Sequence, residues 1–156
     1  MALRQATLVF LLKDKQILLA MKKRGFGVGH WNGVGGKPEK GEAIEDTAVR
    51  ECQEEIGVTP KNLQHMATLN FYFPADKAKE GWNQQVLVYL AQEWDGEPAE
   101  TEEMAPKWFR QSKLPFDQMW EDDRFWLPAV LRGVHVEGDF TFGEDGHLED
   151  YKITAK

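Results

Sequence analysis

The sequence predicts an α/β protein in which a mixed β-sheet is sandwiched between helices. Strand-like and helix-like segments are interspersed along the chain, and several neighbouring strands are joined in ways that favour antiparallel pairing. The 156 residues are enough for one domain with a substantial core, so we expect residues 1–156 to form a single domain. A hydrophobic content of 42% and a charged content of 29% are ordinary for a soluble globular protein.

The N-terminal part of the chain begins with two short apolar segments. Thr7–Leu12 and Ile17–Met21 are expected to be strands around a polar turn at Lys13–Gln16. Gly25–Gly36 is rich in glycine, so we expect a loop there, with a short extended piece at Trp31–Val34.

One helix and two longer strands occupy the middle of the chain. The helix is expected over Ile44–Ile56, where Gly57 ends it. Leu63–Phe73 and Gln84–Glu93 have the composition of strands. Between them, the polar segment Pro74–Asn83 contains proline and glycine and is expected to be a mobile loop.

The C-terminal part combines a short strand, a second helix and a hairpin. Lys107–Arg110 is expected to be the strand and Asp122–Leu131 the helix, which Pro128 should kink or shorten. Val134–Phe142 and Leu148–Thr154 are expected to pair as a closing hairpin.

Charge and composition exclude several classes of function. A net charge of −7 argues against broad binding to DNA or RNA, which relies on basic surface. No run approaches the ~18 apolar residues of a membrane span, and the apolar stretch Ala6–Leu12 lacks a signal-peptide cleavage site. A single cysteine permits no internal disulfide, which is consistent with a reducing cytosol. We therefore expect a cytoplasmic protein that binds neither membranes nor polymeric nucleic acid.

The most informative stretch is Gly36–Val58, which reads GKPEKGEAIEDTAVRECQEEIGV. Glu51, Glu54 and Glu55 share one face of the predicted helix, because positions three and four apart are neighbours. Carboxylates at this spacing repel one another unless a cation is bound, and oxygen ligands suit Mg²⁺ or Mn²⁺. A solvated acidic helix face is the alternative interpretation.

The spacing of this stretch resembles the Nudix box. The one departure is Cys52, where the family usually has Ile, Leu or Val, and a buried cysteine behaves as a small hydrophobe. The resemblance implies a Nudix fold, an α/β/α sandwich, with the box at residues 36–58. It also implies hydrolysis of a nucleoside diphosphate linked to another group. The matching positions are Gly36, Glu42, Arg50, Glu51, Glu54, Glu55, Gly57 and Val58.

The same resemblance implies a metal site for phosphate chemistry. A divalent cation neutralises phosphate oxygens and lowers the pKa of a bound water. Arg50 would orient a glutamate through a bidentate pair. Glu42 would support the loop or pair with Arg50, and the alternative is a capping role near the helix start. The implied metal ligands are the carboxylates of Glu51, Glu54 and Glu55 and the backbone carbonyl of Gly36.

Two roles in the hydrolysis stay open in the sequence. The general base is Glu55 or a carboxylate from a distant loop, Glu102 or Glu103, and the alternative for the latter two is a solvated charge. The basic cluster Lys22–Arg24 either holds phosphates, with Lys22 as the binding residue, or is a solvated strand end.

Three segments outside the box resemble the MutT-type subfamily of animal oxidised purine nucleoside triphosphatases (8-oxo-dGTPases). They are Met21–Lys37, Glu102–Phe109 and Leu114–Pro128. The resemblance implies that Asn32 bonds the purine edge through its amide and that Trp120 stacks on the base.

The same subfamily resemblance implies that Asp122 and Asp123 read the other edge of the purine. Adjacent carboxylates in a partly dry pocket raise one pKa, so one of them can stay protonated and donate a hydrogen bond. The competing interpretation is that one of the two caps the second helix. The remaining walls of the pocket would be Thr7, Phe26, Phe71, Phe73, Met104 and Trp126.

We therefore expect a monomeric enzyme that hydrolyses purine (deoxy)nucleoside triphosphates with Mg²⁺. Oxidised purines such as 8-oxo-dGTP or 2-hydroxy-dATP are the expected substrates, and a monophosphate and pyrophosphate the products. The alternatives are an ADP-ribose or nucleotide-sugar pyrophosphatase and a nucleotide-sensing domain without activity. One departure bears on this choice: Pro74–Asn83 is longer than the matching loop of the subfamily and brings Trp82 to the border of the predicted base slot.

Overall fold

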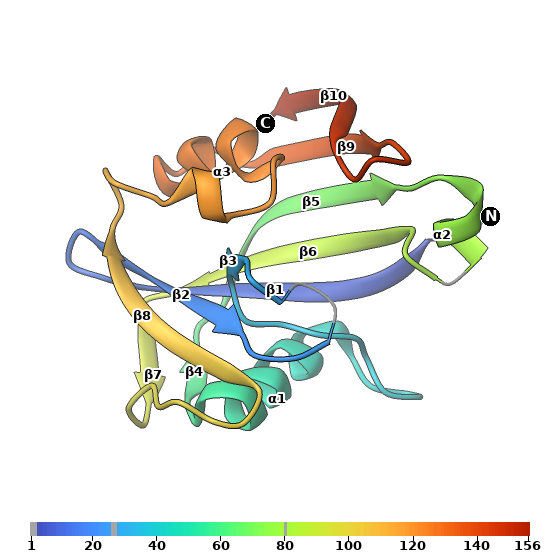
Figure 1. The fold of residues 1–156 in the computed structure, drawn as a ribbon. Helices are drawn as coiled ribbons and strands as arrows, with labels where there is room; N and C mark the ends of the chain where they lie inside the picture. The colour runs from blue at the N-terminus through green and yellow to red at the C-terminus, as the bar shows by residue number, and fades with distance from the viewer. Residues whose placement is uncertain (1–2, 26–27, 80) are drawn as a thin grey trace.

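The computed structural model describes residues 3–25, 28–79 and 81–156, and a mixed β-sheet runs through its centre (Figure 1). The sheet has the strand order β10-β9-β5-β6-β1-β2-β3, and β8 pairs with β2. Its strands are β1 (Arg4–Lys13), β2 (Gln16–Lys22), β3 (Trp31–Asn32), β5 (Gln64–Tyr72), β6 (Gln84–Ala91), β8 (Met104–Arg110), β9 (Val136–Phe142) and β10 (Leu148–Ala155).

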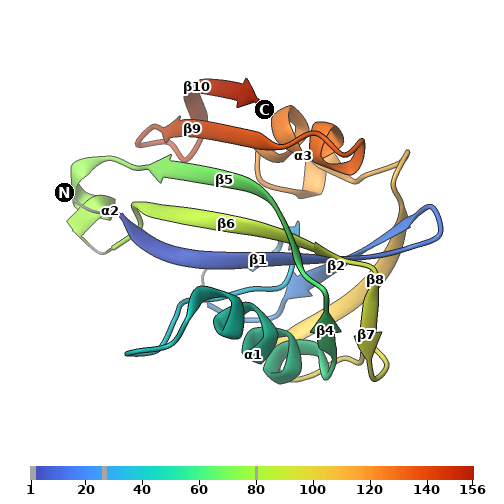
Figure 2. The same ribbon diagram turned by 180° about the vertical axis from the view of Figure 1, so that it is seen from behind.

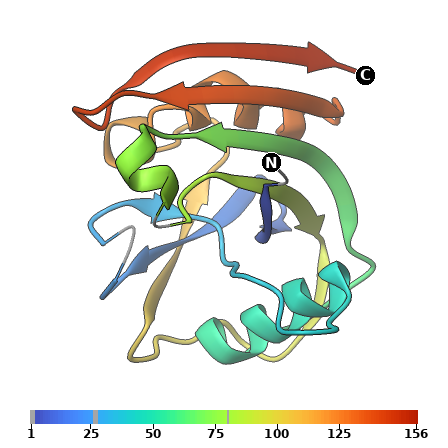
Figure 3. The ribbon, with the colours of Figure 1, turned by 90° about the vertical axis from the view of Figure 1, so that its right-hand side faces the viewer.

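The pairing of these strands confirms the predicted mixed sheet. β1 runs parallel to β6, and β5 runs parallel to β9. The other pairs are antiparallel, including β5 with β6 and the predicted C-terminal hairpin β9–β10, which forms one edge of the sheet (Figure 3). The expected strands at 7–12, 17–21 and 107–110 lie inside longer strands.

Two helices cover opposite faces of the sheet, α1 (Ile44–Ile56) and α3 (Asp123–Leu131) (Figures 1 and 2). Successive side chains of a strand point to opposite faces, so β1 contributes to two cores. Val9 and Leu11 pack in the cluster under α1, whereas Phe10 and Leu12 pack in the cluster under α3. The continuous apolar run of β1 is therefore explained by burial on both faces.

Helix α1 has the bounds that the sequence predicts. Its buried face consists of Thr47, Ala48, Cys52 and Ile56, which confirms the expectation that Cys52 faces the core. Gly57 adopts a left-handed conformation with φ of 74°, and its N–H donates to the carbonyl of Gln53 at 3.2 Å. Glycine is favoured at this position because a left-handed residue ends the helix without a Cβ clash.

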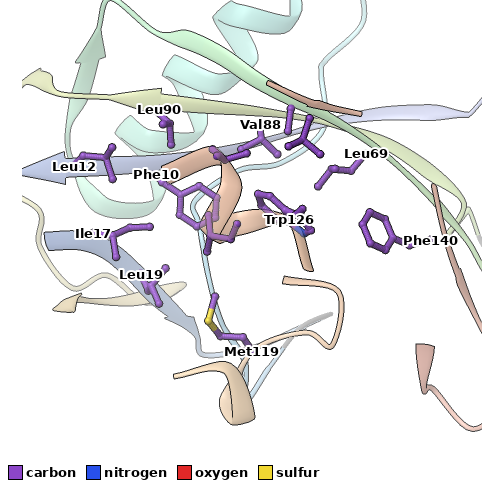
Figure 4. Packing of buried hydrophobic residues seen from close by; sticks show 14 of the residues in the cluster. Phe10, Leu12, Ile17, Leu19, Leu69, Val88, Leu90, Met119, Trp126 and Phe140 are labelled. Carbon is purple, nitrogen blue, oxygen red and sulfur yellow. The ribbon is translucent and has the colours of Figure 1, made fainter. Parts of the chain in front are cut away.

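Helix α3 closes the second core with Trp126, Leu127 and Val130, all fully buried. Figure 4 shows Trp126 in this core near Phe10. The Trp126 and Phe10 rings lie with centroids 6.2 Å apart. Pro128 lies inside the helix, which ends three residues later at Leu131. The helix thus carries the large apolar residues that anchor its preceding segment against the sheet.

The structure corrects one prediction and adds two short strands. Pro74–Asn83 is not a loop throughout, because it contains the short helix α2 (Ala75–Lys79). The N–H of Ala78 donates to the carbonyl of Pro74 at 2.9 Å, and the Ala and Lys residues of this turn favour helix. The strands β4 (Thr59–Lys61) and β7 (Glu93–Asp95) pair with each other and are too short to give an alternating pattern.

No helix within the described part of the chain is both long enough and apolar enough to cross a membrane.

Candidate active site

A cleft of about 680 Å³ opens beside the central strands. Its lining combines residues of α1, the glycine-rich segment before α1, the strands β1, β2, β5 and β6, and the start of α3. Residues that are far apart in the sequence therefore share one cavity. The carboxylates come from α1, and the aromatic rings come mostly from β5 and from the region of α3.

Arg50 is the centre of the polar network on α1. Its Nε and Nη2 atoms donate to the two carboxylate oxygens of Glu42 at 2.8 and 3.0 Å. Its Nη1 donates to Glu51 at 2.9 Å and to Glu54 at 3.1 Å. A further bond runs from Nη2 to the carbonyl of Lys37 at 3.0 Å. The guanidinium thus connects the glycine-rich segment to the acidic face of the helix.

The charge on Glu42 is fixed by this network. The hydrogen bond from Arg50, followed by those from Thr47 and the backbone of Glu39, lowers the pKa of Glu42 to about 2. The Thr47 hydroxyl donates to Glu42 at 2.7 Å. Of the roles considered for Glu42, the structure therefore favours the bidentate pair with Arg50.

Glu51 and Glu55 form a close carboxylate pair in the cleft. Burial, followed by the charge of Glu51, raises the pKa of Glu55 to about 8. Burial also raises the pKa of Glu51, against the opposing charge of Arg50. Within the described residues, the buried Oε2 atom of Glu55 has no hydrogen-bond partner. Two carboxylates that share a proton in this way provide a place where a cation would be stabilised.

Gly36 lies directly against this pair. A Cβ atom at Gly36 would approach the carboxyl carbon of Glu51 to 2.4 Å, so only glycine leaves room for the carboxylate. The carbonyl of Gly36 accepts the N–H of Thr7 at 2.8 Å. Glu54 differs from its neighbours, because it is exposed on the outer side of the helix and bonded to Arg50.

The donor chemistry of this end of the cleft fits a divalent cation. In the described ranges, no three His, Cys, Asp or Glu side chains converge at one point to hold an ion by themselves. Glu51 and Glu55 do offer carboxylate oxygens, one of them unsatisfied and buried. Mg²⁺ usually takes few protein carboxylates and completes its shell from water and phosphate, so an incomplete oxygen set is compatible with it.

Asp122 and Asp123 form a second carboxyl pair at the start of α3. Their exposed fractions are 3% and 2%. The indole N–H of Trp126 donates to Oδ2 of Asp122 at 2.8 Å. Burial raises the pKa of Asp122 to about 6, and burial together with the charge of Asp122 raises the pKa of Asp123 well above its usual value. At neutral pH the pair therefore keeps a proton.

The geometry of this pair bears on its two possible roles. Asp122 precedes the first residue of α3 but makes no capping hydrogen bond through its side chain. Among the residues described, no partner is found for the buried Oδ2 atom of Asp123, and both aspartates line the cleft. These observations favour ligand recognition over helix capping.

Trp120 and Asn32 also line the cleft, together with His30. The rings of Trp120 and His30 are stacked, with centroids 4.2 Å apart and planes 7° apart. Oδ1 of Asn32 accepts the N–H of Gly33 at 2.8 Å, which fixes the orientation of the amide. The predicted base-binding residues thus meet in one place, although they come from β3 and from the segment before α3.

The remaining predicted wall residues are also brought to the cleft, except for one outside the described residues. Phe26 is that residue. Phe73 stacks on Phe142, with centroids 5.3 Å apart, and this places a flat aromatic surface in the cavity. The residues that reach the lining are Thr7, Lys22, Phe71, Phe73, Met104 and Trp126.

Glu103 is not among the described residues that line this cavity. It accepts a hydrogen bond from Nε of Arg24 at 3.0 Å, and this bond lowers its pKa. Glu102 has a side chain that is 90% exposed, and Lys23 is paired with Glu100. Of Lys22, Lys23, Arg24, Glu102 and Glu103, only Lys22 is found among the described residues that line the cleft.

Sequence reasoning missed some residues of the cleft. His30, Lys37 and Gln84 line it, as does Trp82, which was expected at the border of the base slot but was not among the predicted site residues. The rings of Trp82 and Phe73 pack nearly perpendicular to each other, with centroids 5.4 Å apart. His30 could have been predicted, because it lies between Gly29 and Trp31 in a segment that was already assigned to the site.

A model of the NUDIX domain family matches residues 2–153, so the chain belongs to the Nudix family of hydrolases. Two curated relatives share the name oxidized purine nucleoside triphosphate hydrolase. The zebrafish (Danio rerio) protein is 41% identical over 147 residues, covering 94% of this chain and 92% of its own length. The mouse (Mus musculus) protein is 39% identical over 150 residues, covering 96% and 94%.

A solved structure supports the fold. A mutator MutT protein from Bacillus halodurans superimposes with a TM-score of 0.79 at 25% identity, and the match covers 97% of each chain.

Proposed function

We propose that this Nudix hydrolase converts purine (deoxy)nucleoside triphosphates, above all oxidised purines such as 8-oxo-dGTP or 2-hydroxy-dATP, to monophosphates and pyrophosphate with Mg²⁺ as cofactor. The bond broken lies between the α- and β-phosphates. The names of the two animal relatives support this choice of substrate. Mn²⁺ is expected to replace Mg²⁺, because both take oxygen ligands.

One observation carries the proposal: a single cleft joins the carboxylates of α1 to the buried carboxyl pair Asp122 and Asp123. Burial raises the pKa of both aspartates, which favours a proton on the pair. A protonated Asp123 donates a hydrogen bond, and an ionised Asp122 accepts one. An oxidised purine presents both donors and acceptors on its edges, so a pair with one proton is suited to it. Trp120 and Asn32 lie in the same cavity and would stack on the ring and bond its other edge.

The phosphate end of the cleft is assigned as follows. Glu51, Glu55 and the Gly36 carbonyl would hold the cation at the cleft, and Glu54, which is not among the described residues that line the cleft, would join them as the third predicted carboxylate. The cation when bound neutralises phosphate charge and activates water. Lys22 lines the same cleft as Glu55, and its positive charge would bind a phosphate there. Arg50 orients Glu51 and Glu54.

The general base is proposed to be a carboxylate that takes a proton from the attacking water. Of the two main candidates, Glu55 lies in the cleft, whereas Glu103 is paired with Arg24. This arrangement supports Glu55. The predictions of one domain over residues 1–156, of a monomer and of a cytoplasmic location belong to the same proposal.

The proposal is tested by following pyrophosphate and phosphate release from a panel of nucleotides with Mg²⁺, and again with a chelator. The panel contains 8-oxo-dGTP, 2-hydroxy-dATP, dGTP, dATP, dCTP, ADP-ribose and a nucleotide sugar. We expect pyrophosphate release with the highest kcat/KM on an oxidised purine, and no turnover with the chelator. Preference for ADP-ribose or a nucleotide sugar would replace the substrate assignment. Binding without turnover would favour a nucleotide-sensing domain.

A further inference from the structure

Glu121 lies in the sequence between Trp120 and Asp122, two of the residues to which purine recognition is assigned, but its own side chain points elsewhere. Its neighbours Trp120 and Asp122 line the cleft, whereas Glu121 is not among the described lining residues. Its carboxylate turns instead toward the hairpin β9–β10. Oε1 accepts the backbone N–H of Leu148 at 2.8 Å, and Nδ1 of His147 lies 3.1 Å from Oε1 and 3.2 Å from Oε2.

The hairpin that Glu121 contacts is part of the main sheet. Leu148 is the first residue of β10, which pairs with β9 along most of its length at the edge of the main sheet. The turn that carries His147 is closed by backbone bonds, from Gly143 N–H to the His147 carbonyl at 2.9 Å and from Gly146 N–H to the Gly143 carbonyl at 3.1 Å. A side chain bonded there is attached to the sheet.

The segment that carries Trp120 has mainly local backbone bonds of its own. The N–H of Asp123 donates to the carbonyl of Trp120 at 3.1 Å, and the N–H of Phe125 donates to the carbonyl of Asp122 at 3.0 Å. These bonds shape the turn into α3 but do not connect it to another element. The Glu121 carboxylate supplies such a connection over 26 or 27 positions in the sequence.

Charge reinforces the contact. The hydrogen bond and the charge of Glu121 raise the pKa of His147, with a smaller contribution from Asp145. The backbone bond from Leu148 lowers the pKa of Glu121, and the charges of His147 and Arg124 act in the same direction. The pair is largely exposed, and such pairs contribute little to the free energy of unfolding. We therefore expect the Glu121–His147 contact to affect the position of the segment that carries Glu121 and not the stability of the whole protein.

We infer that Glu121 is a positioning residue for base recognition: by bonding Leu148 and His147 at the β9–β10 turn, it holds Trp120, Asp122 and Asp123 at the spacing that a purine requires. The inference rests on the proposed function, because it assigns base recognition to these three residues. Glu121 acts through its neighbours and not on the phosphates, so its loss changes binding of the base and not the chemical step.

The test compares Glu121→Ala and Glu121→Gln with the wild-type enzyme on 8-oxo-dGTP, measuring kcat and KM separately. Loss of a charged hydrogen bond is expected to raise KM about tenfold in Glu121→Ala, with kcat within about twofold of wild type. Glu121→Gln keeps an acceptor for the Leu148 N–H and is expected to restore most of the affinity. His147→Ala removes only the imidazole, so its KM should lie between wild type and Glu121→Ala.

Asp117→Ala is the matched control. It removes a carboxylate from the same connecting segment, where Asp117 is fully exposed and lies 3.6 Å from Arg124. Its KM should equal that of wild type. A second readout is hydrogen exchange at residues 119–123, which Glu121→Ala should accelerate and Asp117→Ala should not.

Three results would overturn the inference. They are an unchanged KM in folded Glu121→Ala, a fall in kcat at constant KM, or the same KM increase in Asp117→Ala. If the wild-type enzyme does not hydrolyse purine triphosphates, the proposed function itself fails and the inference with it. An active wild type with an unaffected Glu121→Ala variant refutes the inference alone.

Discussion

At the scale of single residues, Arg50 shows how one side chain organises the phosphate end of the cleft. It bonds Glu42 through two atoms and reaches Glu51 and Glu54 through a third. Lysine keeps the charge but lacks the planar fork that makes these bonds together. Arg50→Lys should therefore lower kcat about 10–100-fold, as is typical when a residue that orients metal ligands is lost. Steady-state kinetics with 8-oxo-dGTP measures this change, and exposed Arg132→Lys is the control.

The two cleft carboxylates of α1 are expected to act on the chemical step. Glu51→Gln and Glu55→Gln remove a charge without much change in shape, so each should lower kcat at least about 100-fold while the folded structure is retained. Glu103→Gln distinguishes the two candidates for the general base. If Glu55 is the base, kcat of Glu103→Gln stays within about tenfold of wild type. A larger loss in Glu103→Gln than in Glu55→Gln would reverse the assignment. Exposed Glu97→Gln serves as the control for an added amide.

Asp123 is expected to make the stability of the protein depend on pH. Its folded pKa is raised by burial and by Asp122, so the folded state binds more protons than the unfolded state. Stability is then highest below the unfolded pKa of about 4 and falls as the pH rises toward the folded pKa. Asp123→Asn removes this dependence.

Thermal melting at a series of pH values tests the role of Asp123. The fall in Tm from pH 4 to pH 8 should be smaller in Asp123→Asn than in wild type, and the variant should be at least as stable at pH 8. A steeper fall in the variant would mean that Asp123 is ionised in the folded state.

At the scale of elements, the two glycines before α1 have separable roles. A Cβ at Gly35 would lie 1.8 Å from the backbone carbonyl oxygen of Thr7, which cannot move without disturbing β1. A Cβ at Gly36 would meet the side chain of Glu51, which can rotate away. Gly35→Ala should therefore destabilise the fold by about 1–3 kcal/mol, whereas Gly36→Ala should retain the fold but displace a carboxylate of the site.

This pair of variants is checked by thermal melting and kinetics together. Gly36→Ala should melt within about 3 °C of wild type and lose at least about tenfold in kcat. Gly35→Ala should melt several degrees lower. Equal loss of stability in both variants would show that Gly36 is required by the backbone and not by Glu51.

Long elements with a buried apolar face were predicted correctly from the sequence, whereas several short elements were not. Helix α1 was predicted at its observed bounds because Cys52 and Ile56 lie on its apolar face and Gly57 ends it. Helix α2 was not predicted, because proline and glycine in a short polar segment are also typical of a loop. The strands β4 and β7 are three residues each, which is too short for an alternating pattern.

The two ends of the site differ in how many of their contacts could be predicted from the sequence. At the α1 end, local spacing places Glu51, Glu54 and Glu55 on one face of the helix, and two of them, Glu51 and Glu55, line the cleft. The bond between Glu121 and Leu148 depends on the placement of the hairpin beside α3, and no local pattern reveals it. The pairing of Glu103 with Arg24 likewise joins β8 to the end of β2, and only the folded chain shows it.

At the scale of the whole molecule, the sheet brings two kinds of chemistry to one cavity. Helix α1 lies on one face and α3 on the other, and each supplies a pair of carboxyl groups with raised pKa values. The cleft that contains both pairs has a volume of about 680 Å³. Trp82, which follows helix α2 in the chain, also lines this cavity.

The central claim is that the cleft selects an oxidised purine and cleaves its triphosphate. The most direct test is internal competition between 8-oxo-dGTP and ADP-ribose in one reaction with Mg²⁺, which measures the ratio of their kcat/KM values. We expect a ratio of at least about 100 in favour of 8-oxo-dGTP, because a site built to hydrogen-bond one base strongly rejects ligands that leave its buried polar groups unpaired. A ratio of one or below would contradict the account and assign the cleft to a different nucleotide.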